Sequence, residues 1–288
     1  MASRAVSTPS ALSGTLGECI GEFFGTMVLI LFGDGCVATF GLFRGPLPGA
    51  NEWTVIILGW GLAVMLGIYT TGAISGAHLN PAVTLGLAVR GKVGWNKVLP
   101  YWGAQVLGAF VAAGILYFVY RGAITAAIGG ANIADTAKGV GYVFYTSPKD
   151  FVGTFGAFGD EFIGTALLVG LIFAIVDGRN QPVQGNINPF IIGLLIVAIG
   201  ASFGGNSGYA INPARDFGPR LWIALVSGGA SFSAKNYYFW IPIVAPLLGG
   251  VAGAFIYDFT IGKVLAAKGL GPSGDTETKG EAVREPAV

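Results

Sequence analysis

The sequence predicts an all-α membrane protein with six transmembrane helices and two short re-entrant half-helices in an inverted repeat. Three observations predict this fold: an apolar composition, apolar segments of two distinct lengths, and a pattern that occurs twice. Of the 288 residues, 53% are hydrophobic and 11% are charged, whereas a soluble domain carries roughly 25% charged residues. The 48 glycines also fit a membrane protein, because glycine lets transmembrane helices approach closely.

The charged and metal-binding residues exclude several classes of function. The formal net charge is +1, so we expect no basic surface for nucleic acid. One histidine and two cysteines offer no metal constellation of the kind found in zinc sites. The apolar segments also lack the Asp/Glu-rich ligand set of a membrane-embedded enzyme. We therefore expect no catalytic residue, no metal and no cofactor.

Eight apolar segments give the predicted helices. A helix needs about 20 mostly apolar residues to cross a bilayer, and six segments are long enough to be spans: 16–40, 55–73, 95–120, 161–176, 189–203 and 238–261. Two shorter segments, 81–89 and 213–226, each follow an Asn-Pro pair. Asn favours the cap of a helix and Pro its first position, so these two are predicted half-helices.

Basic residues predict how the chain lies in the membrane. Six spans place both termini on one side. Most of the basic residues near the spans fall on that same side, namely Arg4, Arg90, Lys92, Lys97, Arg179, Lys263 and Lys268. The positive-inside rule therefore predicts cytoplasmic termini, and we expect the protein to lie in the plasma membrane.

The same pattern divides the chain into one membrane domain, residues 16–262, with a cytoplasmic tail at each end. The tails are residues 1–15 and residues 263–288, and we expect the second, charged tail to be disordered. Inside the domain we expect a first repeat at about 16–120, an extracellular connector at about 121–159 and a second repeat at about 160–262.

The two halves carry matching motifs in the same order. Residues 22–26 (EFFGT) recur at 161–165 (EFIGT), and residues 75–82 (SGAHLNPA) recur at 207–214 (SGYAINPA). Each half has three spans, an odd number, so the second half must enter the membrane from the opposite face. Inverted repeats with broken helices place a substrate site near the midplane of the bilayer.

In such an arrangement the half-helices meet with their N-termini facing each other. The N-terminus of a helix carries a partial positive charge and free N–H groups, and irregular backbone at membrane depth lines a wet cavity or is buried in protein. We expect Asn80 and Asn212 to cap the half-helices and still offer N–H donors. The residues whose carbonyl oxygens are expected to line the path are Gly76, Ala77, His78, Leu79, Gly208, Tyr209, Ala210 and Ile211. Acceptors and central donors suit water or a polyol, while the helix ends and Arg215 repel cations.

Glu22 and Glu161 are ionisable residues inside predicted spans, at equivalent places in the two repeats. Such residues usually face the interior of the bundle. One interpretation is a proton relay. The other is that each carboxylate accepts hydrogen bonds from backbone N–H groups of the adjacent re-entrant loop. The duplication favours this supporting role.

At this point the sequence resembles the aquaporin family. The resemblance rests on two Asn-Pro-Ala boxes, Asn80-Pro81-Ala82 and Asn212-Pro213-Ala214, the second followed by Arg215, and it covers residues 16–262. Within the family the chain is similar to the aquaglyceroporins, whose markers match Tyr120, Asp216, Arg220, Pro242 and Ile243. The resemblance implies a right-handed bundle and a homotetramer with one pore in each protomer.

The resemblance also implies a selectivity filter, the narrowest part of the pore, at Trp60, Gly200, Tyr209 and Arg215. Water-selective relatives have His where Gly200 stands, so we expect glycine to widen the passage. Trp60 and Tyr209 would face the carbon backbone of a polyol while Arg215 donates to its hydroxyls, which offsets the cost of dehydration. Bacterial glycerol facilitators have Phe where Tyr209 stands, which leaves the balance between glycerol and water open.

The expected function is a passive channel that conducts glycerol, related small polyols or urea, and water, and that excludes ions and protons. The expected partners are these neutral solutes, membrane lipid and copies of the same chain. One alternative is an aquaporin that conducts mainly water. Another is an ion-coupled secondary transporter, which also uses inverted repeats but needs a coupling carboxylate at the midplane. A pH gate at His78 is an alternative to its role as a carbonyl donor to the path.

Overall fold

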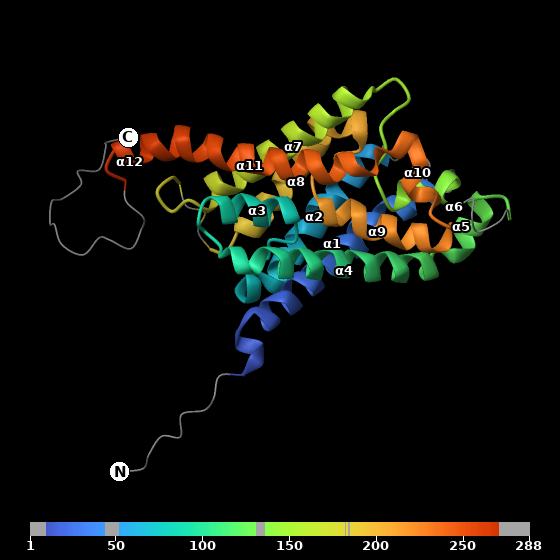
Figure 1. Cartoon of the computed structure of the whole chain (residues 1–288), viewed down its shortest axis with the longest axis horizontal. Helices are drawn as coiled ribbons and strands as arrows, with labels where there is room; N and C mark the ends of the chain where they lie inside the picture. The colour runs from blue at the N-terminus through green and yellow to red at the C-terminus, as the bar shows by residue number, and fades with distance from the viewer. Residues whose placement is uncertain (1–9, 44–51, 131–135, 182, 184, 271–288) are drawn as a thin grey trace, which may run out of the picture.

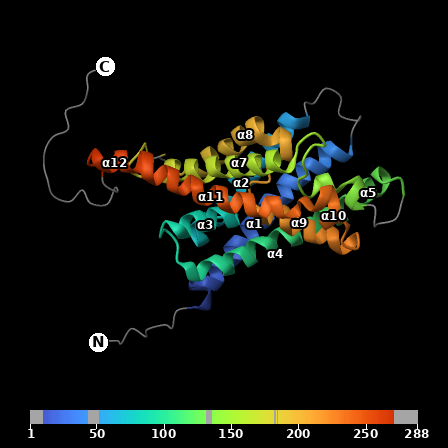
Figure 2. The same ribbon diagram turned by 45° about the horizontal axis from the view of Figure 1, so that its top comes forward.

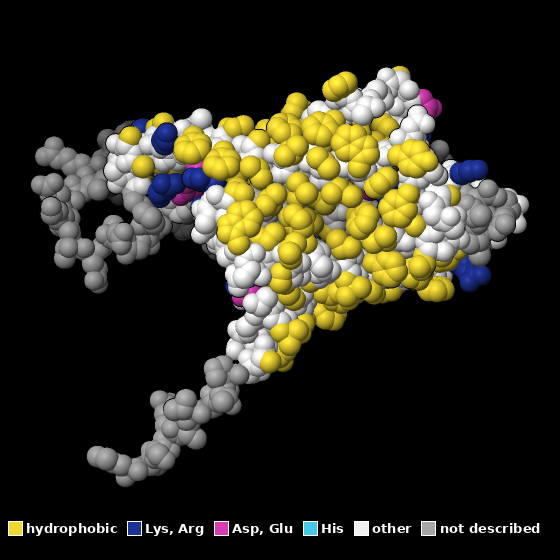
Figure 3. Space-filling view, in the orientation of Figure 1, with side chains coloured by type: hydrophobic (Ala, Val, Ile, Leu, Met, Phe, Trp, Pro, Cys, Tyr) yellow, Lys and Arg dark blue, Asp and Glu magenta, His cyan; other side chains and the backbone are white. Residues whose placement is uncertain are grey.

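The computed structural model describes residues 10–43, 52–130, 136–181, 183 and 185–270, and these form helices and connecting loops without a strand. Six helical segments are long and apolar enough to cross a membrane, as predicted. Five of them are single helices, and in the sixth α11 is the central part: α1 (Thr15–Leu42), α2 (Glu52–Ser75), α4 (Trp95–Val119), α7 (Thr154–Val176), α8 (Asn188–Ser207) and α11 (Ile241–Tyr257). They run along the long axis of the molecule (Figure 1). Hydrophobic side chains cover the middle of the face shown in Figure 3, and charged side chains lie toward its two ends.

Two half-helices occupy the interior, α3 (Pro81–Val89) and α9 (Pro213–Val226), with the bounds that the sequence predicts. They enter from opposite ends of the bundle (Figure 1). Each packs mainly against the last span of the other repeat: α3 against α11, and α9 against α4. The two repeats therefore interlock, and the predicted fold of six spans and two inverted half-helices is confirmed.

The repeats also meet at a pair of glycines related by the sequence repeat. A Cβ atom added to Gly61 of α2 would lie 2.7 Å from the backbone oxygen of Gly193 in α8. A Cβ atom added to Gly193 would lie 2.6 Å from the backbone oxygen of Gly61. Only glycine lets the two backbones approach this closely, so this contact fixes the packing of one repeat on the other.

Gly193→Ala should therefore destabilise the protein by about 1–3 kcal/mol, the usual range for an overpacked contact. Gly205→Ala is a matched control on the same helix, because a Cβ atom at Gly205 has open space around it. Thermal unfolding of the two purified variants in detergent would compare them. Equal melting temperatures would show that the α2–α8 contact tolerates a methyl group.

The connector between the repeats is folded over one end of the bundle. It contains α5 (Arg121–Ala127), α6 (Thr136–Gly139) and a 3-10 helix at Gly141–Val143. The apolar side chains of Val140, Val143 and Phe144 are fully buried, which explains the folding. The following span, α7, begins at Thr154 rather than at residue 161, because the chain already turns helical after the extended cap at Gly153.

The expectation of a disordered tail from residue 263 onward is wrong at its start. A π-helical turn at Asp258–Gly262 extends α11 into α12 (Lys263–Ala267). Leu265 of α12 is buried, and burial of this apolar side chain favours an ordered helix here. Residues 271–288 and 1–9 lie outside the described residues. The start of α1 and the helix α12 lie at the same end of the molecule, away from α5 and α10 (Ala230–Tyr237) (Figures 1 and 2).

Candidate functional site

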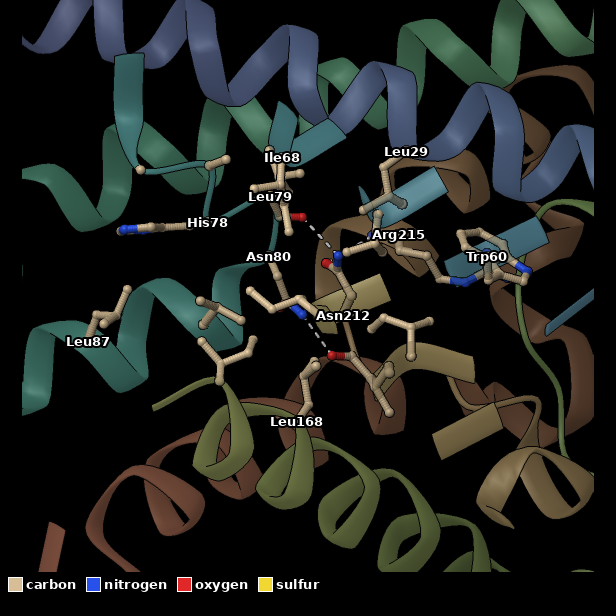
Figure 4. Close-up of a pocket in the computed structure, with 18 of the residues that line it drawn as sticks. Leu29, Trp60, Ile68, His78, Leu79, Asn80, Leu87, Leu168, Asn212 and Arg215 are labelled. Carbon is tan, nitrogen blue, oxygen red and sulfur yellow. Dashed lines mark hydrogen bonds between the residues drawn. The ribbon is translucent and has the colours of Figure 1, made fainter. Parts of the chain in front are cut away.

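A cavity of about 340 Å³ runs between the two repeats. One side of it is apolar and is formed by side chains of the spans: Leu29, Trp60, Val64, Ile68, Leu168, Ile172, Val176, Ile192 and Ile196. The other side contains the two re-entrant segments with Asn80, Asn212 and Arg215. Trp60 and Arg215 lie together toward one end of the close-up in Figure 4, and Leu87 lies toward the other.

The two asparagines meet at the centre of this cavity. The Asn80 Oδ1 atom accepts a hydrogen bond from the Ala82 N–H at 2.8 Å, which caps α3, and its Nδ2 atom donates to the Ile211 carbonyl at 2.8 Å. Asn212 does the same in the other repeat: its Oδ1 atom accepts from the Ala214 N–H at 3.0 Å, and its Nδ2 atom donates to the Leu79 carbonyl at 2.8 Å (Figure 4). Pro81 and Pro213 are the first residues of the half-helices.

These bonds leave each asparagine with one free donor. An amide nitrogen carries two hydrogens, and the structure gives each Nδ2 atom one described acceptor. The second N–H of Asn80 and of Asn212 is therefore available to a solute. The carbonyls of Leu79 and Ile211 already accept these cross-repeat bonds, which no local sequence pattern indicates.

The re-entrant segments adopt a backbone that repeats in the two halves. The φ angles of Gly76, Ala77 and Leu79 are +84°, +47° and +53°, and those of Gly208, Tyr209 and Ile211 are +93°, +42° and +45°. Left-handed backbone at non-glycine residues costs about 1–3 kcal/mol each, so other contacts must hold it. The segment residues that line the cavity are Gly76, Ala77, His78, Leu79, Tyr209, Ala210 and Ile211; Gly208 is absent from this lining.

Glu22 and Glu161 provide those contacts. Glu22 accepts hydrogen bonds from the backbone N–H groups of His78 at 2.9 Å and Leu79 at 2.7 Å, and from the Ser75 hydroxyl at 2.6 Å. Glu161 accepts from the N–H groups of Ala210 and Ile211, both at 2.8 Å, and from the Ser207 hydroxyl at 2.7 Å. The residues lie where a support of the re-entrant loops would lie, and neither lines the cavity.

Three of the four predicted filter residues line one end of the cavity. The guanidinium carbon of Arg215 lies 3.9 Å from the centre of the Trp60 ring, a cation–π contact. Gly200 does not line the cavity. A Cβ atom there would lie 2.7 Å from Cζ of Tyr209 and 2.8 Å from Cγ2 of Ile57. The room that glycine leaves is thus filled by the Tyr209 ring, instead of simply widening the passage.

Arg215 has a partner that sequence reasoning missed. Its Nη1 atom donates to Oδ1 of Asp34 at 3.0 Å and to the Phe144 carbonyl at 3.3 Å. Asp34 lies in α1 and is fully buried. It is an ionisable residue near the middle of a predicted span, and that signal could have identified it, although it has no counterpart in the second repeat.

The aquaglyceroporin markers lie beside the cavity rather than on it. Asp216 and Arg220 form a fully buried ion pair one helical turn apart, 2.7 Å between Nε and Oδ1. The Tyr120 hydroxyl is hydrogen-bonded to the Thr39 hydroxyl at 2.9 Å at the end of α4. Pro242 and Ile243 belong to the first turn of α11. None of these markers is among the residues that line the cavity.

A second cavity of about 590 Å³ continues from the first and shares Lys92 and Val176 with it. Its charged lining residues are Arg90, Lys92, Asp177, Arg179, Asp258 and Lys263. Hydrogen bonds from the Arg179 guanidinium hold the pKa of Asp177 well below its usual value. The lining of this second cavity therefore carries both positive and negative charges near neutral pH. Among the described residues there is no group of His, Cys, Asp and Glu that could hold a metal ion.

Two inverted repeats whose broken helices meet inside a shared cavity define a membrane transport protein of the inverted-repeat class. Residues 10–257 match the family model described as major intrinsic protein. The chain belongs to that family, which contains the aquaporins, so the predicted family is confirmed.

Named relatives and a solved structure agree with this family assignment. The chain is 44% identical over 253 residues to aquaglyceroporin-3 of Trypanosoma brucei brucei, covering 88% of this chain and 81% of that protein. It is 41% identical over 245 residues to human aquaporin-9, covering 85% and 82%. The crystal structure of the aquaglyceroporin from Plasmodium falciparum superposes with a TM-score of 0.79 at 36% identity, covering 88% of this chain and all of that one.

Proposed function

We propose that the protein is a passive channel that conducts glycerol, related small uncharged solutes such as other polyols and urea, and water, while excluding ions and protons. The observation that carries the proposal is the two-sided cavity. An apolar wall that includes Trp60 faces the free donors of Asn80, Asn212 and Arg215. The similarity to proteins named aquaglyceroporins supports this class of solute.

The cavity suits a polyol because each part of the solute finds a partner. The carbon backbone lies against the apolar wall, and the hydroxyls bond to Arg215 and to the backbone carbonyls of the re-entrant segments. Removing a hydroxyl from water without such a partner costs several kcal/mol, so solutes without matching groups are rejected. At the centre, the donors of Asn80 and Asn212 and the two facing helix N-termini disfavour cations.

The remaining expectations belong to the same proposal. The channel assembles as a homotetramer in the plasma membrane, with lipid around it and both termini in the cytoplasm. The basic residues of the second cavity support this orientation, since they gather at one end of the molecule and the cytoplasmic side is the more basic. The domain comprises residues 16–262. The channel needs no cofactor and catalyses no reaction.

Proteoliposomes test the proposal. Stopped-flow light scattering should show glycerol and water permeabilities well above those of empty liposomes, and an uncoupler should leave glycerol entry unchanged. Glycerol entry that requires an ion gradient would favour the secondary transporter. Fast water flux with glycerol flux at the level of empty liposomes would favour the water-conducting aquaporin.

Tyr209→Phe tests the filter. The Tyr209 hydroxyl is buried and has no hydrogen-bond partner among the described residues, so its loss should not destabilise the fold. It should raise the ratio of glycerol to water permeability about two- to tenfold. The wall facing the polyol carbons becomes more apolar, and water loses a hydroxyl partner at the filter, for which one hydrogen bond is worth roughly 0.5–1.5 kcal/mol. Tyr120→Phe, outside the cavity, is the matched control and should leave the ratio unchanged. An unchanged ratio in Tyr209→Phe would remove Tyr209 from the filter.

A further inference from the structure

Asp34 is a carboxylate buried in the membrane-spanning part of the protein beside the filter. Its side chain has no exposed surface, and its Oδ1 atom accepts a hydrogen bond from Nη1 of Arg215 at 3.0 Å. Its Oδ2 atom is buried without a hydrogen-bond partner among the described residues. A buried carboxylate is costly unless it is paired, so this position needs the arginine that it contacts.

Arg215 is held on three sides. Asp34 and the Phe144 carbonyl both accept from Nη1, and the centre of the Trp60 ring lies 3.9 Å from the guanidinium carbon. The Nε and Nη2 atoms donate to no described residue, and Arg215 lines the cavity. The contact with Asp34 therefore fixes one edge of the guanidinium and leaves donors of the other edge for a solute.

The neighbouring buried charges do not compensate Arg215. Asp216 pairs with Arg220, and both side chains are fully buried. Glu161 accepts hydrogen bonds from backbone N–H groups and the Ser207 hydroxyl. Asp34 is thus the carboxylate in contact with Arg215, and together the two residues form a neutral pair.

We propose that Asp34 is the positioning and charge-balancing residue of the filter. It holds Arg215 against Trp60 and cancels its charge, so that the passage presents hydrogen-bond donors without a net positive charge. This inference rests on the proposed function of the protein as a channel for neutral solutes. It adds that exclusion of anions at the filter depends on Asp34, as exclusion of cations there depends on Arg215.

Two single variants and their combination test the pairing by the sign of the ion that leaks. Asp34→Asn keeps the shape and an acceptor oxygen but leaves Arg215 unbalanced, so a conductance selective for anions should appear. Arg215→Gln leaves Asp34 unbalanced, so the conductance should be selective for cations. The double variant has neither charge and should lose most of the leak of both single variants. Each leak should exceed that of the native protein on the order of tenfold, since one uncompensated charge acts at a few ångströms.

The measurement is the reversal potential across planar bilayers under a gradient of potassium nitrate, with purified full-length protein. Glycerol flux into vesicles of the same preparation reports whether each variant forms an open pore. Asp34→Glu keeps the charge and should exclude nitrate as the native protein does. If Asp34→Asn does not reconstitute, Arg215→Gln against the double variant still tests the pair, because the cation leak should fall when Asp34 is neutralised.

The outcomes separate this inference from the proposed function. Native protein that carries no glycerol would refute the channel. Native protein that carries glycerol, together with an Asp34→Asn variant that carries glycerol but no nitrate, would refute the charge-balancing role alone. A cation leak of equal size in Arg215→Gln and in the double variant would also refute it.

Discussion

Asp216→Ala is expected to lower the stability of the folded protein by about 3–5 kcal/mol, because it leaves the charge of Arg220 buried and unpaired. Both side chains are fully buried. Asp216 also accepts hydrogen bonds from the N–H and hydroxyl groups of Thr146, both at 2.8 Å, and Arg220 donates to the carbonyls of Thr146 and Ser231, both at 3.0 Å. The substitution therefore removes two of the three hydrogen bonds between Thr146 of the connector and α9. Thermal unfolding of the purified protein in detergent measures the loss.

Two controls show whether the buried charge causes the loss. Replacing both partners, as in Asp216→Leu with Arg220→Met, should recover part of the stability, because a buried pair can often be exchanged for apolar side chains at little cost. Asp150→Ala breaks an ion pair with Lys235 at the surface, and surface pairs contribute little, so no measurable change is expected. An Asp216→Ala variant as stable as Asp150→Ala would contradict the assigned role.

Local signals explain which parts of the fold could be predicted. The half-helices α3 and α9 begin where predicted because Asn and Pro set a helix start within two residues, and in the structure Asn80 and Asn212 do cap them. The spans are predictable because a helix that crosses the bilayer needs a long apolar segment. The inverted repeat followed from residues 22–26 and 161–165, whose glutamates reach equivalent loops.

Contacts between distant segments explain what the sequence could not reveal. Asp34 and Arg215 are 181 residues apart, and no local pattern links them. The filling of the space beside Gly200 depends on where the Tyr209 ring packs, which neither residue determines alone. The charged composition from residue 263 onward predicts disorder and gives no sign of the helix α12, in which Leu265 is buried.

Glu161→Ala is expected to have a still larger effect than Asp216→Ala, because it leaves two buried backbone donors unsatisfied in a strained segment. These are the N–H groups of Ala210 and Ile211; the Ser207 hydroxyl keeps an acceptor in Asp160 at 2.6 Å. Each donor left unsatisfied costs about 1–3 kcal/mol. The strained backbone at Ile211, with φ at +45°, also loses its restraint. We expect little folded protein, measured as the yield of monodisperse material in detergent and its melting temperature.

The corresponding residue of the first repeat has a control one helical turn away. The N–H groups of His78 and Leu79 donate to different oxygens of Glu22, so Glu22→Gln leaves one of the two without its acceptor and should lower the melting temperature and both permeabilities together. Glu18→Gln alters a carboxylate of the same helix that bonds to Lys97 and Tyr101, outside the cavity and the re-entrant loop, and should affect the protein much less.

A proton relay predicts a different pattern, in which Glu22→Gln folds normally and loses only transport that depends on a proton gradient. A stable Glu22→Gln variant with that selective loss would favour the relay over the support, and loss of stability together with both fluxes would favour the support.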